Sequence, residues 1–195
     1  VWAWLNASFR IAPRDVPLDA EEDAVDLDEL TRQQFAALRG AFELPRVAIV
    51  GPAGSGKTLL ALWKLDALLE EGKRALYVCF NKALAEHLKL ANPEMSAAIT
   101  SVDRLFYQLT NVPDGRKFGP TFFTEELPSL VQDVAAELPL QSKYEAIIVD
   151  EGQDFGELRL LALVDLLTPS GQWLFLAYWE QNVYKSTKQE PIGAE

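Results

Sequence analysis

The sequence predicts an α/β fold of three layers, in which helices cover both faces of a mainly parallel central sheet. Short apolar segments alternate with segments of helical length along most of the chain, which is the pattern of strand–helix–strand units. The chain has 195 residues, of which 49% are hydrophobic and 24% charged, a composition typical of a globular protein with one core. Ligands of such sheets bind beyond the carboxyl ends of the strands, so the loops at those ends are the candidate sites.

The chain divides into an N-terminal extension with an acidic linker, residues 1–29, and a domain at residues 30–195. The segment Asp15–Glu29 contains eight carboxylates and no basic residue, which is typical of a solvated linker. Phe9 lies before it in a short aromatic segment that has the composition of a strand but no assigned function. The chain begins with valine and not methionine, and we expect it to be a piece of a longer protein.

The first part of the domain alternates helix and strand. Residues 31–42 have apolar side chains at helical spacing and predict a helix. The β-branched run at 47–50 predicts a buried strand, and residues 59–72 predict a helix that ends at a glycine. The apolar run at 75–80 predicts a second strand, followed by a helix at 81–90.

The same alternation continues to the end of the domain. A short strand at 97–100 and a helix at 101–110 precede a Gly/Pro-rich stretch at 111–120, which predicts a surface loop. The later segments predict helices at 124–138 and 156–167 and strands at 144–149 and 173–178.

Charge and composition exclude several classes of protein. The formal net charge of -11 argues against a protein that covers nucleic acid with a basic surface. One cysteine and one histidine cannot supply a zinc site of those residue types. No apolar run approaches the ~20 residues that cross a bilayer, so we expect a cytoplasmic protein with no membrane partner. The single cysteine, Cys79, agrees with a reducing compartment, and its apolar surroundings indicate a small buried side chain.

A phosphate-binding loop follows the strand at 47–50. GPAGSGKT fits the pattern G-x-x-x-x-G-K-[ST] and lies between a strand and a helix, as that motif requires. Glycines allow backbone N–H groups to surround an anion, and the helix adds the positive end of its dipole. We expect Lys57 to reach the β- and γ-phosphates and the Thr58 hydroxyl to bind Mg²⁺. The expected nucleotide contacts are Gly51, Gly54, Ser55, Gly56, Lys57 and Thr58.

Two carboxylates end the strand at 144–149. Asp150 is expected to hold the water shell of Mg²⁺, and Glu151 to orient or deprotonate a water that attacks the γ-phosphate. Solvated acids at a strand end are an equally common explanation when the segment is taken alone. The phosphate loop favours the functional interpretation, with both loops carried by adjacent parallel strands around one magnesium-triphosphate.

The order Asp150-Glu151-Gly152-Gln153-Asp154 resembles motif II (D-E-x-Q-D) of superfamily 1 helicases of the UvrD/Rep type. GPAGSGKT resembles their motif I, YVCFNKALAEHL their motif Ia, and WLFLAYWEQNVY their motif III. The resemblance covers about residues 30–184, and within this family the sequence is most similar to the helicase portion of nuclease-related-domain helicases. It implies the RecA-like type of P-loop NTPase fold, bound ATP and Mg²⁺, single-stranded DNA as a partner, and a second RecA-like domain in the parent chain.

The resemblance also implies roles for further residues. LTRQQ is similar to the family's adenine-reading segment, which places Gln34 against the adenine edge. Phe80 and Asn81 fall where the family contacts single-stranded DNA, although a strand end packed under a helix cap explains them equally well. Gln181 matches the glutamine that senses the γ-phosphate, and Gln153 is expected to contact the γ-phosphate or couple domains, with capping of the next helix as the alternative.

The sequence departs from the family in ways that bear on activity. Tyr178 and Trp179 stand where motif III has an acidic pair, and Asp103 or Val102 replaces the histidine of motif Ib. Thr187 lies near the position of the family's γ-phosphate arginine, a residue type that contributes ~10³–10⁵ in rate. The chain alone is therefore expected to hydrolyse ATP weakly or not at all. A nucleotide-binding switch or interaction module without helicase activity is the alternative, and a P-loop ATPase or kinase of another family is a third.

Overall fold

The computed structural model describes residues 7–10, 40, 42, 44–112, 118, 119 and 121–178. The strands are β1 (Ala7–Arg10), β2 (Arg46–Gly51), β3 (Ala75–Cys79), β4 (Ile99–Ser101), β5 (Tyr144–Asp150) and β6 (Leu167–Tyr178). The α-helices are α2 (Lys57–Glu70), α3 (Lys82–Ala91), α4 (Val102–Thr110), α5 (Leu127–Glu137) and α6 (Glu157–Asp165). Short helical turns are η2 (Pro93–Ala98), η3 (Phe122–Glu126), η4 (Leu140–Ser142) and η5 (Gly152–Asp154). The helix predicted at 31–42 and the loop predicted at 111–120 lie largely outside the described residues.

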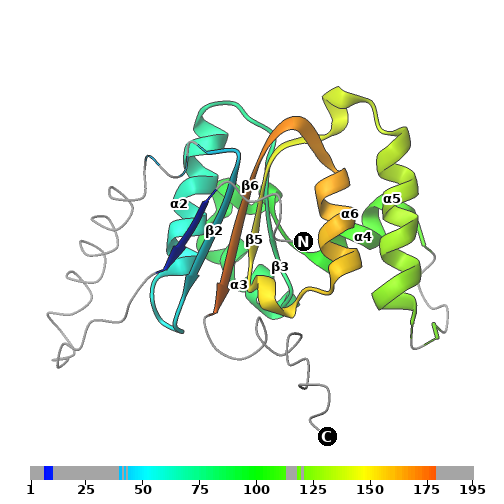
Figure 1. Ribbon diagram of the computed structural model, residues 1–195, viewed down its shortest axis with the longest axis horizontal. Coiled ribbons are helices and arrows are strands. Elements are labelled where there is room, and N and C mark those ends of the chain that lie inside the picture. The colour runs from blue at the N-terminus through cyan, green and yellow to red at the C-terminus, as the bar shows by residue number, and fades with distance from the viewer. Residues whose placement is uncertain are drawn as a thin grey trace, which may run out of the picture.

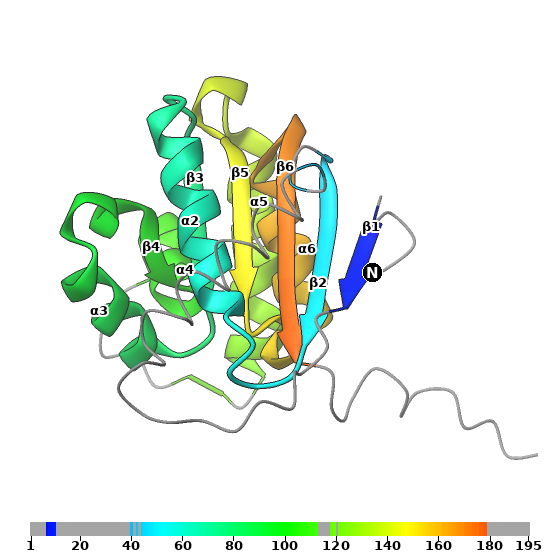
Figure 2. The same cartoon turned by 90° about the vertical axis from the view of Figure 1, so that its left-hand side faces the viewer.

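The predicted three-layer α/β fold is confirmed. Within the described residues, six strands form one sheet in the order β1-β2-β6-β5-β3-β4, and each neighbouring pair is parallel (Figure 2). Helices α2 and α3 cover one face of the sheet, and α4, α5 and α6 cover the other (Figure 1). Because the strands run in one direction, their carboxyl ends all meet at one edge, where the arrowheads point in both views.

Each face of the sheet carries its own part of the core. In β5, Ile147 and Val149 pack toward α5 and α6, whereas Ile148 packs toward α2. This alternation follows from the two-residue period of a strand, and it explains why the run is apolar throughout: both faces are covered. The strand is therefore held rigidly up to its last residue, Asp150, which is 2% exposed.

The predicted adjacency of the two loop-bearing strands is wrong. Strand β6 lies between them, paired with β2 on one side and with β5 on the other. The sequence predicts which segments are strands, but buried parallel strands are all apolar and carry no signal of their order in the sheet. As a result, the end of β6 reaches the sheet edge between the phosphate loop and the acidic loop.

Two further differences concern strand limits. Strand β6 begins at Leu167 and not at 173. The extra residues, 168–171, form a register shift opposite the start of β5, because Tyr144 pairs with Leu167 whereas Ala146 pairs with Gln172. At the other edge, β1 pairs in parallel with β2, so the segment that includes Phe9 joins this sheet. The division of the chain at residue 30 stays a prediction.

Candidate functional site: the carboxyl edge of the sheet

The phosphate loop connects β2 to α2 through residues whose backbone only glycine adopts easily. Gly54 has φ of 73°, and Gly56, the N-cap of α2, has φ of 76°. Side chains disfavour this left-handed region, so the motif glycines are required by the turn itself. Among the described residues no side chain caps α2, and its first turn contains no acidic residue. The N–H groups at this helix end are thus oriented for an anion.

Lys57 is held inside the loop that it follows. Its side chain is buried, and Nζ donates to Gly51 O at 2.9 Å, Pro52 O at 2.6 Å and Ser55 Oγ at 3.2 Å. The ammonium also lies 4.1 Å from the centroid of the Tyr178 ring. Burial lowers the pKa of Lys57, and the negative charge of Asp150 opposes that shift. A buried ammonium with these neutral partners is well placed to bind an anionic group brought to the loop.

Asp150 receives hydrogen bonds from three parts of the chain. The Thr58 hydroxyl in α2 and the Tyr77 hydroxyl in β3 each donate to Oδ2 at 2.7 Å, and the Glu151 N–H donates to Oδ1 at 2.9 Å. Because Thr58 directly follows Lys57 and contacts Asp150, Lys57 and Asp150 lie at the same end of the sheet. A hydroxyl and a carboxylate in contact form an oxygen-only set, which fits a hard divalent cation.

Glu151 has a strained backbone and a perturbed carboxyl group. Its φ of 54° lies in the left-handed region, which costs a residue other than glycine about 1–2 kcal/mol. This turn directs the chain away from the strand immediately after Asp150. Partial burial, followed by the charges of Asp150 and Asp154, raises the pKa of Glu151. A carboxyl group with a raised pKa is a better general base while it remains ionised at neutral pH.

Gln153 connects the acidic loop to the end of β6. Its Oε1 accepts a hydrogen bond from the Tyr178 backbone N–H at 3.1 Å. It does not cap α6, whose N-cap residue is Gly156. Gly152 lies against the same strand, since a Cβ there would lie 2.2 Å from two ring carbons of Phe175. The loop thus packs closely on the strand that separates it from the phosphate loop.

A pocket of about 380 Å³ opens at the phosphate loop. Tyr178 lines it together with loop and α2 residues, so the aromatic ring that covers the Lys57 ammonium is also a wall of the pocket. Partial burial and the nearby carboxylates of Glu151 and Asp150 raise the pKa of Tyr178, which keeps the phenol neutral. Tyr178 is the first of the two residues that stand at the expected acidic pair, so an aromatic ring lines the pocket at this position.

Comparison with known proteins agrees with this geometry. A family model described as an AAA domain matches residues 33–186, which is most of the chain. The chain belongs to the AAA domain family. Cytidylate kinase of Thermosipho melanesiensis is 31% identical to this AAA domain over 129 residues, which are 59% of the chain and 58% of that protein. The chain thus spans less than two thirds of that relative's length. The chain is a P-loop nucleotide-binding domain.

The AAA domain places the predicted DNA residues on a different part of the same edge. Phe80, at the end of β3, is 40% exposed; its ring contacts Phe155 edge-on at 6.0 Å between centroids and lies 5.1 Å from the Arg159 guanidinium. Asn81 caps α3, because its Oδ1 accepts from the N–H groups of Ala83 at 2.8 Å and Leu84 at 3.3 Å. The two residues therefore have structural partners, and contact with DNA stays a prediction.

Some predicted residues lie outside the described part of the AAA domain, and one important residue was missed. Gln34 and Gln181 are not among the described residues. The sequence pattern places Tyr77 in an apolar strand and predicts no role for it, yet its hydroxyl donates to Asp150. A buried tyrosine normally needs a hydrogen-bond partner, so its presence in a fully apolar strand was the available signal.

Cys79 is fully buried, and burial raises the pKa of its thiol to about 12, which fits the predicted structural role.

The described residues include neither a ready-made group of metal ligands nor a membrane-spanning helix. No group of three or more His, Cys, Asp or Glu side chains in this part of the chain is arranged to hold a metal ion by itself. None of the described helices has the length and hydropathy to span a membrane.

Proposed function

We propose that the chain is the ATP-binding motor domain of a UvrD-like superfamily 1 DNA helicase or ATPase. Joined to a second RecA-like domain, it would couple ATP hydrolysis to movement along single-stranded DNA. The hydrogen bond from the Tyr178 N–H to Gln153 Oε1 carries the proposal. It connects the acidic loop to β6, whose last described residue, Tyr178, is three residues before Gln181 in the sequence. In the proposed function this contact couples the acidic loop to Gln181, the proposed γ-phosphate sensor.

The nucleotide roles follow from the positions of the side chains. Lys57, released from Gly51 O and Pro52 O, binds the β- and γ-phosphates, and Gln34 contacts adenine. The Thr58 hydroxyl and, through water, Asp150 would hold Mg²⁺. When bound there, the cation would supply positive charge to the phosphate oxygens. Glu151 accepts a proton from the attacking water, helped by its raised pKa.

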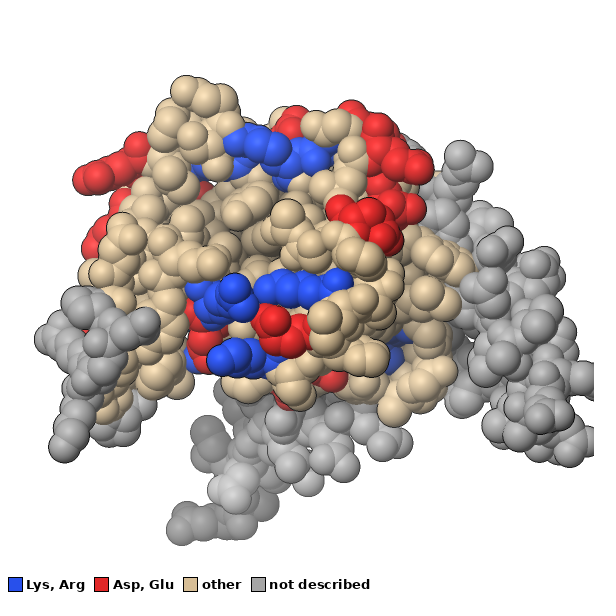
Figure 3. Space-filling view, turned by 180° about the vertical axis from the view of Figure 1, so that it is seen from behind, with Lys and Arg blue, Asp and Glu red and all other residues tan. Residues whose placement is uncertain are grey.

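The DNA role rests on Phe80. An exposed aromatic ring held on one side by Phe155 and Arg159 offers a rigid face on which a base can stack. Basic side chains on the face seen in Figure 3 occur in groups broken by acidic ones, so phosphate contacts there would be few. This arrangement suits stacking on single-stranded bases better than tight binding of the phosphate backbone.

Two other functions have support. A nucleotide-binding switch without helicase activity is favoured by Tyr178, which fills the pocket wall at the position of the expected acids. A phosphotransferase is favoured by the similarity to cytidylate kinase of Thermosipho melanesiensis. Each function predicts a different fate for the γ-phosphate: it goes to water, stays on ATP, or goes to a nucleotide acceptor.

The test is an ATPase assay with Mg²⁺ on this chain and on the longer protein that contains it. Phosphate release is measured alone, with oligo(dT), with duplex DNA and with RNA, and formation of CDP is measured with CMP. We expect little turnover by the chain alone and stimulation by oligo(dT) in the longer protein. ATP binding with no turnover under any condition would favour the switch, and phosphorylation of CMP would favour the kinase.

A further inference from the structure

Among the described residues, the buried hydroxyl of Tyr77 in β3 has one hydrogen-bond partner, the Asp150 carboxylate. Tyr77 is fully buried in β3, and its hydroxyl donates to Asp150 Oδ2 at 2.7 Å. Strands β3 and β5 are neighbours, with Tyr77 opposite Ile148 and Cys79 opposite Asp150. The side chain therefore reaches along the sheet, toward the carboxyl edge, to meet the carboxylate.

The three donors that hydrogen-bond to Asp150 differ in whether they lie on a segment that would contact a bound ligand. Thr58 can donate its proton to Oδ2 while its oxygen lone pairs face a cation, and the Glu151 N–H belongs to a loop at the surface. Both of these donors lie on segments that would contact the ligand. Only the Tyr77 hydroxyl belongs to the rigid sheet core, and so it can fix the carboxylate before and after binding.

We propose that Tyr77 is a positioning residue that holds the Asp150 carboxylate in the orientation needed to receive a hydrated divalent cation bound to a nucleotide. The inference rests on the proposed ATP and Mg²⁺ site, and it adds a residue outside the phosphate loop and the acidic loop. Partners of this kind, which orient a metal-binding group without touching the metal, typically change metal affinity about 10- to 100-fold when removed.

The experiment compares wild type with Tyr77→Phe, which removes only the hydroxyl. ATP affinity is measured by calorimetry with Mg²⁺ and with EDTA, and the ratio of the two affinities is the readout. We expect the Mg²⁺ enhancement to fall about tenfold or more in Tyr77→Phe, with the affinity in EDTA unchanged. Tyr144→Phe, at the opposite end of β5, is the matched control and should keep the wild-type ratio.

Other outcomes separate this inference from the proposed function. A wild-type chain that fails to bind ATP would overturn the proposed nucleotide and the inference with it. Wild-type Mg²⁺ enhancement that survives in Tyr77→Phe would overturn the inference alone, as would an equal loss of affinity with and without Mg²⁺. A Mg²⁺ titration followed by thermal shift at saturating ATP gives the same comparison from its midpoint, even if the variant is less stable.

Discussion

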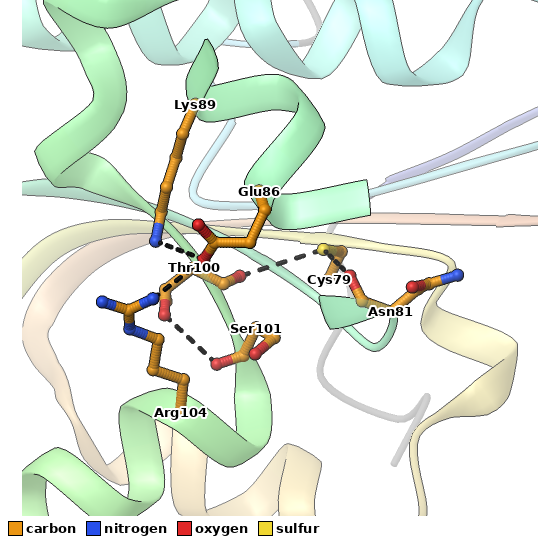
Figure 4. A network of polar contacts seen from close by, with 7 residues as sticks. All are labelled: Cys79, Asn81, Glu86, Lys89, Thr100, Ser101 and Arg104. Atoms are coloured by element: carbon orange, nitrogen blue, oxygen red, sulfur yellow. Dashed lines mark hydrogen bonds and ion pairs between the residues drawn. The ribbon is translucent and has the colours of Figure 1, made fainter. Parts of the chain in front are cut away.

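Two regions at the carboxyl edge of the sheet differ in the exposure of their charged side chains: one buries them and the other leaves them largely in solvent. In the first, the buried phosphate–acid site, Lys57 is 5% exposed and Asp150 2%. In the second, the α3–α4 surface, Glu86 Oε1 lies 3.1 Å from Lys89 Nζ and 2.8 Å from Arg104 NH1, with Glu86 and Arg104 roughly half-exposed (Figure 4). Exposed pairs of this kind contribute little to stability, about 0–1 kcal/mol.

The difference in burial between the two regions indicates which of them a bound ligand would stabilise. Burying a charge costs free energy unless it is paired and hydrogen-bonded, so the buried phosphate–acid site is maintained against a cost that a triphosphate and a cation would offset. The charges of the α3–α4 surface lose little hydration, and two cations already share one carboxylate there. Changes in the buried site should therefore have large effects, and changes at the surface small ones.

The largest effect is expected from Lys57→Ala. The variant removes the ammonium that would replace its bonds to Gly51 O and Pro52 O with bonds to phosphate. Charged hydrogen bonds contribute about 1.5–3 kcal/mol each, so ATP affinity should fall at least about 100-fold in a calorimetric titration. Lys143→Ala, which removes a lysine bonded to Asp165 O, should leave the affinity unchanged. Unchanged ATP affinity in Lys57→Ala would show that the loop does not bind phosphate.

Glu151→Gln should abolish hydrolysis and preserve binding. Loss of a general base slows a reaction about 10²–10⁴-fold, and the amide keeps the shape of the side chain. Because the pKa of Glu151 is raised, the wild-type rate should rise with pH through a midpoint above the ordinary glutamate value of about 4.3. Phosphate release in long incubations checks this, with Glu137→Gln on α5, which does not affect the pKa of Glu151, as the control. Equal rates in wild type and Glu151→Gln would remove Glu151 from the reaction.

Gly152→Ala tests how tightly the buried site is packed. The new Cβ would lie 2.2 Å from the Phe175 ring, which cannot move freely because it is buried in the core. Overpacking of this type costs about 1–3 kcal/mol, so the melting temperature should fall. Gly119→Ala, where a Cβ meets nothing within 4 Å, should melt close to wild type. If both variants melt alike, the acidic loop is free to shift away from β6.

The fold and the two loops could be predicted because each leaves a local pattern. The glycine motif, the apolar run before Asp150 and the helix at 102–110 are all readable within about a dozen residues. The position of β6 between the two loops could not, because strand order depends on packing between distant segments. Tyr77 was missed for the same reason: its partner is 73 residues away. Contacts of this range require the sheet order to be known first.

The smallest effect, and the sharpest test of the α3–α4 surface, is expected from Glu86→Gln. This change frees Lys89 and Arg104 from their shared carboxylate, so both could bind a phosphate of single-stranded DNA. An exposed ion pair contributes up to about 1 kcal/mol, and the affinity for oligo(dT) should therefore rise by up to about fivefold at low salt. Fluorescence anisotropy at two salt concentrations measures it, since the gain should shrink as salt increases.

Glu137→Gln on α5 provides the matched control, because it changes the net charge equally but lies across the sheet from α3, the helix that carries Glu86. A gain confined to Glu86→Gln would place the phosphate track at this surface and show that the chain limits its own DNA affinity there. An equal gain in both variants would reflect net charge alone. No gain in either would leave Phe80 as the remaining candidate contact, and the DNA would then be held by base stacking without help from Lys89 and Arg104.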